Sequence, residues 1–413
     1  MSGWLRQGLG PEYYPQMEKP FWIASFTHMF LEIFLLLQVA LIPVFTKEFG
    51  LSLFEATLAV TVPTMVQLAV NVPAGMLADR LKTRHLLFLS MMIEGGAALF
   101  LSQTSSYWAL ILGICIMRVS SPIYHVAGLS RISRLVSRGR LSRSMGLHNA
   151  LGSLGSAVGT ISLSFFLSTL GWRWTYLFWS LPIVAWGLFV LRSRDLDVEQ
   201  ETRTENHGQR ASRLSIIMSA GFPVFLAFIG LRAVGVVGST TFVPTFLVRE
   251  RGVSEAVASL IFGLGPFMGI VGSLLGGYLG DRVGAKKILS LAVLGSALSL
   301  LCLALLTNID SVVFTYLMFA LCNNTIWSPM NTIVVDLVPV AERGLGFSMY
   351  FLTEGLVEAA SPTIAVQVIG LSSVSTLFLF GVGLVLASLA LLQRLQLRAR
   401  SAASSTRAPS RDI

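Results

Sequence analysis

Long apolar runs alternate with short polar segments along nearly the whole chain. Most runs reach about 20 residues or more, enough for an α-helix to cross the ~30 Å hydrocarbon core of a bilayer. The pattern therefore predicts an all-α integral membrane protein with twelve transmembrane helices. We expect the helices at 21–46, 54–78, 85–104, 107–130, 144–169, 172–191, 214–247, 255–279, 286–306, 311–337, 344–368 and 372–393.

The polar segments divide these spans into two groups of six. We expect an N-terminal six-helix bundle within 1–191 and a C-terminal one within 214–393. The charge-mixed segment 192–213 is predicted to be a cytoplasmic linker, because it has too few apolar residues to form a core. The basic, Ser-rich tail 394–413 is predicted to be disordered and cytoplasmic. Because residues 1–20 are polar, we expect no cleavable signal peptide.

Composition and charge support a membrane protein. The chain is 54% hydrophobic and 12% charged, with a mean hydropathy of +0.72, whereas soluble domains carry about 25% charged residues. The net charge of +9 does not indicate nucleic-acid binding, because Lys and Arg concentrate in alternate loops. Only Lys47, Arg173, Arg249 and Arg251 fall in the others. By the positive-inside rule, we expect a multi-pass cell-membrane (inner-membrane) protein with both termini in the cytoplasm.

One loop motif occurs twice, about half a chain apart. Residues 75–85 read GMLADRLKTRH and residues 277–287 read GYLGDRVGAKK, each between two apolar runs. The repetition predicts two pseudo-symmetric bundles. Glycine allows neighbouring helices to approach closely, and a carboxylate at the end of a span can accept hydrogen bonds from a helix N-terminus. We interpret each copy of the motif as a tight cytoplasmic turn between two spanning helices.

Several ionisable side chains fall inside the apolar runs, where they are costly and usually functional. His28 and Glu32 are four residues apart, as are Glu354 and Glu358, so each pair shares a helix face. These three glutamates are candidate proton carriers, although a structural role for each stays open. The polar or charged side chains within the runs also include Arg118, His125, Arg232, Asn323 and Asn324.

The span 144–169 carries a stripe of small residues. Gly152, Gly155 and Gly159 share a face and predict tight packing against another helix. In the seventh span, Pro244 is expected to loosen the outer end of the helix.

The duplicated loop, the charge pattern and the length together resemble the major facilitator superfamily. Three segments are similar to its fosmidomycin-resistance-type exporters: THMFLE at 27–32, SSPIYHVAGLSRISRL at 120–135 and LRAVGVVGSTTFVP at 231–244. The resemblance implies the major facilitator fold, with the first, fourth, seventh and tenth helices lining a central cavity. It thereby implies these candidate substrate-binding residues in the cavity: His28, Arg118, His125, Arg232, Asn323 and Asn324. It also implies alternating access between the two bundles, with a cytoplasmic gate made by Gly75, Asp79, Arg80, Gly277, Asp281 and Arg282.

The resulting hypothesis is a secondary active transporter for a small organic solute. Proton-coupled drug or metabolite efflux by antiport is the first choice, and proton-coupled import of a small organic anion is the alternative. An enzyme is not expected, because the chain lacks HExxH, GxSxG and paired metal-ligand motifs. We expect no cofactor, no metal and no nucleic acid, and a monomer whose partners are the lipid bilayer, a small-molecule substrate and protons.

Overall fold

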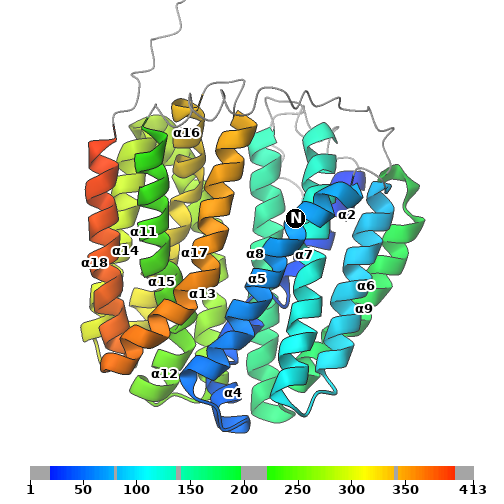
Figure 1. The fold of residues 1–413 in the computed structure, drawn as a ribbon, viewed down its shortest axis with the longest axis horizontal. Coiled ribbons are helices and arrows are strands. Elements are labelled where there is room, and N and C mark those ends of the chain that lie inside the picture. The colour runs from blue at the N-terminus through cyan, green and yellow to red at the C-terminus, as the bar shows by residue number, and fades with distance from the viewer. Residues whose placement is uncertain (1–18, 79–80, 136–140, 197–220, 339–342, 396–413) are drawn as a thin grey trace, which may run out of the picture.

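A computed structural model describes residues 19–78, 81–135, 141–196, 221–338 and 343–395 (Figure 1). These residues form helices joined by short loops, with no strand among them. In the first half the helices are α2 (Lys19–Glu32), α3 (Leu37–Ala40), α4 (Ile42–Glu48), α5 (Leu53–Ala78), α6 (Thr83–Leu101), α7 (Tyr107–Leu135), α8 (Leu141–Thr169) and α9 (Arg173–Arg192). In the second half they are α11 (Phe222–Thr241), α12 (Val243–Arg251), α13 (Glu255–Val283), α14 (Ala285–Leu305), α15 (Ile309–Thr325), α16 (Trp327–Leu337), α17 (Arg343–Leu371) and α18 (Val374–Arg394).

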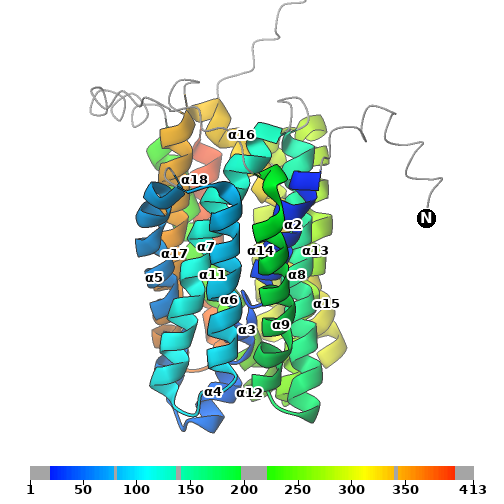
Figure 2. The ribbon, with the colours of Figure 1, turned by 90° about the vertical axis from the view of Figure 1, so that its right-hand side faces the viewer.

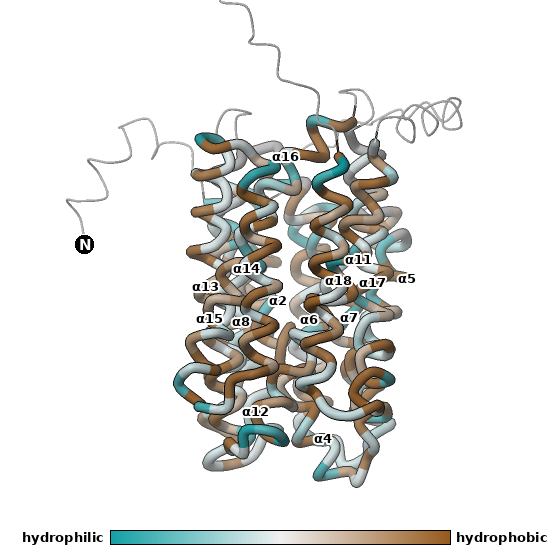
Figure 3. Tube along the Cα trace, turned by 90° about the vertical axis from the view of Figure 1, so that its left-hand side faces the viewer, coloured by the Kyte–Doolittle hydropathy of each residue, from teal (hydrophilic) through white to brown (hydrophobic). Residues whose placement is uncertain are grey.

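The predicted all-α architecture of membrane-spanning helices is confirmed. Within the described residues, eleven stretches are long and apolar enough to cross a membrane, and the 29-residue α17 runs beside them to complete the twelve (Figure 1). Apolar residues dominate the middle of the bundle, and hydrophilic residues gather near its two ends (Figure 3). The described part of the seventh span begins at α11, because 197–220 lies outside the described residues. The predicted linker and tail fall largely in such segments, so those boundaries stay predictions.

The two halves share four helix pairings, although α11 also packs extensively on α18 and α2 makes little contact with α9. In the first half α6 packs on α9 and α7, α5 packs on α7, and α2 packs on α8. In the second half the equivalent helices pair in the same way: α14 packs on α18 and α15, α13 on α15, and α11 on α17. Two independent six-helix bundles would have no reason to share this order. The repeated pairing supports the pseudo-symmetry that the duplicated loop predicted.

The halves meet along two helix pairs, α8 with α13 and α5 with α17. The Ser259 hydroxyl donates to the Thr160 carbonyl at 2.9 Å, and Lys47 Nζ lies 3.4 Å from Glu255 Oε1. Lys47 lies in α4, and Glu255 and Ser259 lie in the first two turns of α13, which follows α12. Helices α4 and α12 are at the same end of the bundle (Figure 2), so polar contacts join the halves near this end.

Glycines allow α2 and α8 to pack backbone to backbone. A Cβ on Gly155 would lie 2.0 Å from the Met29 carbonyl oxygen, and one on Gly159 would lie 1.8 Å from that of Ile33. Only a residue without a side chain fits at either position. The predicted small-residue packing face of this span is confirmed, and its partner is the first span.

Three spans are interrupted rather than continuous. The seventh breaks at Phe242, just before Pro244 of α12, which confirms the predicted loosening. The tenth breaks at Ile326, three residues before Pro329, because a proline cannot donate the helical hydrogen bond and crowds the preceding turn. The first span was predicted to be one helix over 21–46, and that was wrong: it unwinds over 33–36 although no Gly or Pro is present there.

Candidate substrate and proton site

His28, Glu32 and His125 form one cluster, as their positions on α2 and α7 allow. His28 Nε2 lies 3.3 Å from Glu32 Oε1, one helical turn away. The ring of His125 meets that of His28 edge to face, with centroids 5.3 Å apart. The His28 ring also lies nearly parallel to the rings of Tyr124 and His148, with centroid distances of 5.4 Å and 4.3 Å. The pairing of His28 with Glu32 follows from their spacing, whereas their meeting with His125 required the packing of two helices.

Gly152 makes the space for this cluster. A Cβ at Gly152 would lie 2.5 Å from Cε1 of His28, so any larger residue on α8 would push the imidazole aside. The glycine stripe of α8 therefore sets the position of a candidate functional side chain as well as the helix spacing.

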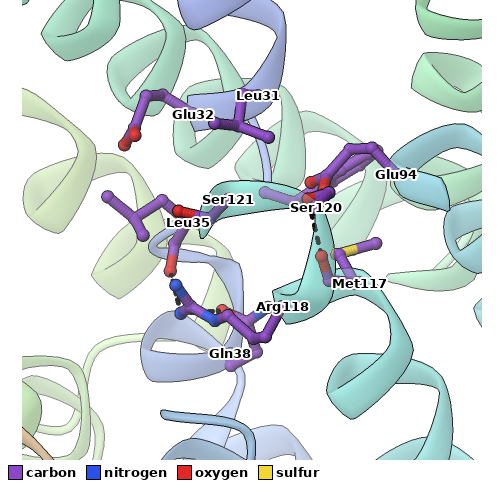
Figure 4. Close-up of a pocket in the computed structure, with 10 residues that line it drawn as sticks. Leu31, Glu32, Leu35, Gln38, Glu94, Met117, Arg118, Ser120 and Ser121 are labelled. Atoms are coloured by element: carbon purple, nitrogen blue, oxygen red, sulfur yellow. Dashed lines mark hydrogen bonds between the residues drawn. The ribbon is translucent and has the colours of Figure 1, made fainter. Parts of the chain in front are cut away.

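Arg118 lies beside the break in the first span. Its Nη2 atom donates to the Leu35 carbonyl at 3.0 Å and to Gln38 Oε1 at 3.3 Å. Its Nη1 atom donates to Gln67 Oε1 at 3.4 Å. Figure 4 shows the guanidinium pointing at the unwound turn. Backbone N–H groups bond to the carbonyls of Glu32, Phe34 and Leu36 in this turn, and a buried carbonyl needs a donor. Arg118 supplies the donor for the Leu35 carbonyl, which helps the first span to unwind without Gly or Pro.

A small cavity of about 20 Å³ lies between this arginine and the Glu32 carboxylate (Figure 4), which is room for about one water. Among its lining residues, the polar ones are Glu32, Gln38, Glu94, Arg118, Ser120 and Ser121. Glu94 is buried and accepts a hydrogen bond from the Ser120 hydroxyl. The site thus presents both a cation and carboxylates to a confined polar space.

Arg232 of α11 has its own partners in the second half. Its Nη1 donates to Asn323 Oδ1 at 3.0 Å, and Nη2 lies 3.7 Å from Glu354 Oε1. The Arg232 and Glu354 side chains are only 5% and 9% exposed. The Nε atom of Arg232 is buried and has no hydrogen-bond partner among the described residues. One donor of this buried cation is therefore unused.

Glu358 connects the two halves electrostatically. It lies one turn after Glu354 on α17 and is exposed. Arg118 of the first half, Arg232 of the second and the carboxylate of Glu32 all lie close enough to interact with its charge. Because α17 also packs on α5 of the first half, Glu358 lies near the junction of the two bundles. The predicted cavity residues thus form two groups, with Glu358 between them.

Two further predictions concern Asn324 and the cytoplasmic gate. Asn324 does not join Asn323 at Arg232: its amide donates to the Ala320 carbonyl at 2.8 Å and packs against Gly269 of α13. At the predicted gate, Asp281 and Arg282 are exposed in the last turn of α13, and Arg282 stacks on Tyr278 at 4.3 Å. Asp79 and Arg80 lie outside the described residues, so the gate stays a prediction.

Some residues of the site had no clear sequence signal. Gln38 is a lone polar residue in an apolar run, which is a weak hint, and Tyr124 looks like an ordinary core aromatic. The Leu35 carbonyl is a backbone group that every residue has. These groups become part of the site only because the first span unwinds beside Arg118.

The family profile of the Major Facilitator Superfamily matches residues 21–356 and 229–411, which together cover most of the chain. The chain belongs to the Major Facilitator Superfamily. It is therefore a multi-pass membrane transporter and not an enzyme, as the repeated loop and apolar runs predicted. The twelve-helix fold agrees with this assignment, and the family resemblance drawn from the sequence is confirmed.

The relatives of this Major Facilitator Superfamily chain include several named transporters. It is 23% identical to the nitrite extrusion protein of Bacillus subtilis (strain 168), over 73% of each chain. It is 21% identical to the probable nitrate transporter NarT of Staphylococcus haemolyticus (strain JCSC1435), over 82% of this chain and 86% of that one. The fosmidomycin resistance protein of Escherichia coli (strain K12) is 20% identical over 66% of this chain and 68% of its own length.

A solved structure supports the fold of this superfamily member. The chain resembles a bacterial homologue of the human lysosomal transporter Spinster, solved in an inward-facing and unoccupied conformation. The TM-score is 0.68 and the sequence identity 15%, with 92% of this chain and 96% of the other covered. At this identity the likeness concerns the arrangement of helices alone.

Proposed function

We propose that this transporter moves a small anion together with a proton, by alternating access between its two bundles. The observation that carries the proposal is the pair Arg118 and Arg232, one from each half, which both act on Glu358. A guanidinium inside a membrane protein is costly and tends to be kept for a charged partner. Its planar set of donors suits carboxylate-like and other oxyanions.

In this proposal Glu358 acts as an internal substitute for the substrate. When its carboxylate is ionised, it supplies the negative charge that the arginines favour. When it takes up a proton, that charge is lost, and an external anion can interact with Arg118 and with the unused Nε donor of Arg232. Proton and anion then favour each other's binding, and this coupling is reciprocal by thermodynamic linkage.

The sign of this coupling favours cotransport. Export by antiport, the first choice from the sequence, requires proton and substrate to exclude each other. The charges around Glu358 instead support joint binding, which is the arrangement of the alternative, a proton-coupled anion importer. The names of two relatives, a nitrite extrusion protein and a probable nitrate transporter, support a small oxyanion as substrate.

Alternating access in this proposal uses the contact between the halves. The Lys47–Glu255 pair and the Ser259–Thr160 bond hold the α4/α12 end together. By the positive-inside rule, we expect this end to lie outside the cell. The opposite end, with Asp281 and Arg282, would act as the cytoplasmic gate, closing as the α4/α12 end opens.

The test is flux in proteoliposomes with an imposed pH gradient, using nitrate and nitrite as probes. Acid outside should drive one or both anions to accumulate inside the vesicles above their outside concentration. Glu358→Gln should abolish this accumulation while downhill anion flux continues, because glutamine mimics the protonated state. Asp310→Asn, on an exposed acidic residue at the start of α15, is the matched control. Gradient-driven accumulation by Glu358→Gln, or efflux driven by acid outside, would contradict the proposal.

A further inference from the structure

The geometry points to a binding site for one divalent transition-metal ion formed by His28, Glu32 and His125. Each residue offers one ligand atom, and the three atoms lie within 4.8 Å of one another. The His28 Nε2 to Glu32 Oε1 separation is 3.3 Å. Two ligands on a tetrahedral zinc ion, with bonds of about 2.0–2.2 Å, are separated by roughly 3.3 Å. One edge of a tetrahedral site is therefore already formed.

The second nitrogen of each imidazole supports this assignment. His125 Nδ1 lies 2.9 Å from the Ser121 carbonyl oxygen, and His28 Nδ1 lies 3.4 Å from that of His148. A ring nitrogen facing a carbonyl carries the proton and donates it, which leaves Nε2 with a free lone pair. Histidines that bind metals characteristically donate their other N–H to a backbone carbonyl or carboxylate. Both histidines of the cluster have this arrangement.

A cation between His28 and Glu32 would stabilise their contact. With Nδ1 of His28 as donor, its Nε2 lone pair faces a carboxylate oxygen, so two acceptors oppose each other at 3.3 Å. A proton or a metal ion between them removes the conflict. The approach of His125 as a third ligand favours the metal, because a proton is shared by two acceptors and needs no third.

The surroundings are built to hold these ligands in place. Stacking on Tyr124 and His148 fixes the plane of His28, and the Ser156 hydroxyl lies 3.5 Å from the second oxygen of Glu32. An independent sign of a missing polar partner is His148, whose Nε2 is buried and unpartnered within the described part of the chain. Two imidazoles and one carboxylate suit zinc, nickel, copper or cobalt rather than calcium or magnesium. Three protein ligands leave a fourth position open.

The test uses the full chain purified in detergent with any affinity tag removed, because a polyhistidine tag would itself bind metal. Titration with Co²⁺ should give the visible absorption of a four-coordinate ion, saturating at one ion per chain. Titration calorimetry with Zn²⁺ gives the same stoichiometry. His28→Ala and His125→Ala should each weaken binding about tenfold or more. His85→Ala, on a histidine in the first turn of α6, should leave it unchanged.

Several outcomes would overturn the site. One is a folded wild-type chain that shows no Co²⁺ absorption, in which case a proton is the only occupant. Another is binding that survives both His28→Ala and His125→Ala. If His28→Ala fails to fold, as judged by thermal unfolding, Glu32→Gln keeps the shape of the side chain and removes its charge. Full retention of Co²⁺ binding by Glu32→Gln would equally contradict the assignment. The site does not depend on the proposed anion transport.

Discussion

At the scale of single residues, Arg118 combines a structural role with a candidate functional one. It donates to the Leu35 carbonyl and to two glutamine side chains, and its charge acts on Glu32, Glu94 and Glu358. Several donors in a fixed plane are needed to satisfy these acceptors together. Lysine keeps the charge but lacks the planar fork.

Arg118→Lys should therefore impair transport although the charge is kept. We expect kcat/KM for the anion to fall at least tenfold, equivalent to about 1.4 kcal/mol of lost transition-state stabilisation. The measurement is initial-rate uptake in proteoliposomes. Arg192→Lys, on an exposed arginine at the end of α9, serves as control. An unchanged kcat/KM would show that charge alone suffices.

The buried pair Arg232–Glu354 makes a different prediction, one of stability. Removing one partner leaves a buried charge without compensation, which costs about 3–5 kcal/mol, whereas replacing both by apolar residues is often neutral. Arg232→Met should lower the midpoint of thermal unfolding in detergent, and the double variant Arg232→Met with Glu354→Met should recover most of the loss. A double variant as unstable as the sum of both single variants would mean that the two residues do not act as a pair.

At the scale of elements, glycines set how closely helices approach. The α2–α8 contact leaves no room for a side chain at Gly159, where a Cβ would lie 1.8 Å from a backbone oxygen. Backbone atoms cannot rotate away as a flexible side chain can, so the helices must separate. The equivalent pair in the second half, α11 with α17, carries Arg232 and Glu354 at its contact instead of the His28–Gly152 pairing. The equivalent helix pairs of the two halves thus carry different side chains at their contacts.

Gly159→Ala should destabilise the first bundle by about 1–3 kcal/mol, the usual cost of overpacking. Thermal unfolding in detergent measures the effect. The control is Gly96→Ala in α6, where an added Cβ meets nothing within 4 Å. Gly96→Ala should be neutral or slightly stabilising, since alanine favours helix. Equal unfolding midpoints for the two variants would contradict the close packing of α2 and α8.

At the scale of the whole molecule, two bundles that share four helix pairings make polar contacts with each other at one end. Contacts near α4 and α12 include Lys47 with Glu255. The predicted gate residues lie at the other end, where Asp281 is exposed in the last turn of α13. A transporter that alternates between two states needs both ends to close in turn.

Asp281→Asn should slow the alternation between the two states without altering the anion-binding site. We expect turnover in proteoliposomes to fall severalfold while equilibrium binding of the anion to the purified protein is kept. Asp195→Asn is the matched control, because Asp195 is also acidic and exposed but pairs with Lys19 at 3.0 Å. Normal turnover in Asp281→Asn would remove this residue from the gate.

The sequence by itself determined the twelve spans, the repeat and the presence of intramembrane charges. The spans are visible in the sequence because a helix that crosses a bilayer must be long and apolar. The repeat is visible because the duplicated loop keeps its motif in both halves. Residues four apart, such as His28 and Glu32, could be paired in advance because helix geometry alone brings them together.

Only the tertiary structure decided which spans meet and how each is rotated. It brought His125 to His28, placed Arg232 against Glu354 and separated Asn324 from Asn323. It also unwound the first span at 33–36, where local propensity favours a helix. The reason is that these features depend on partners distant in sequence: a backbone carbonyl is exposed in the unwound turn because Arg118, from another helix, is there to bind it.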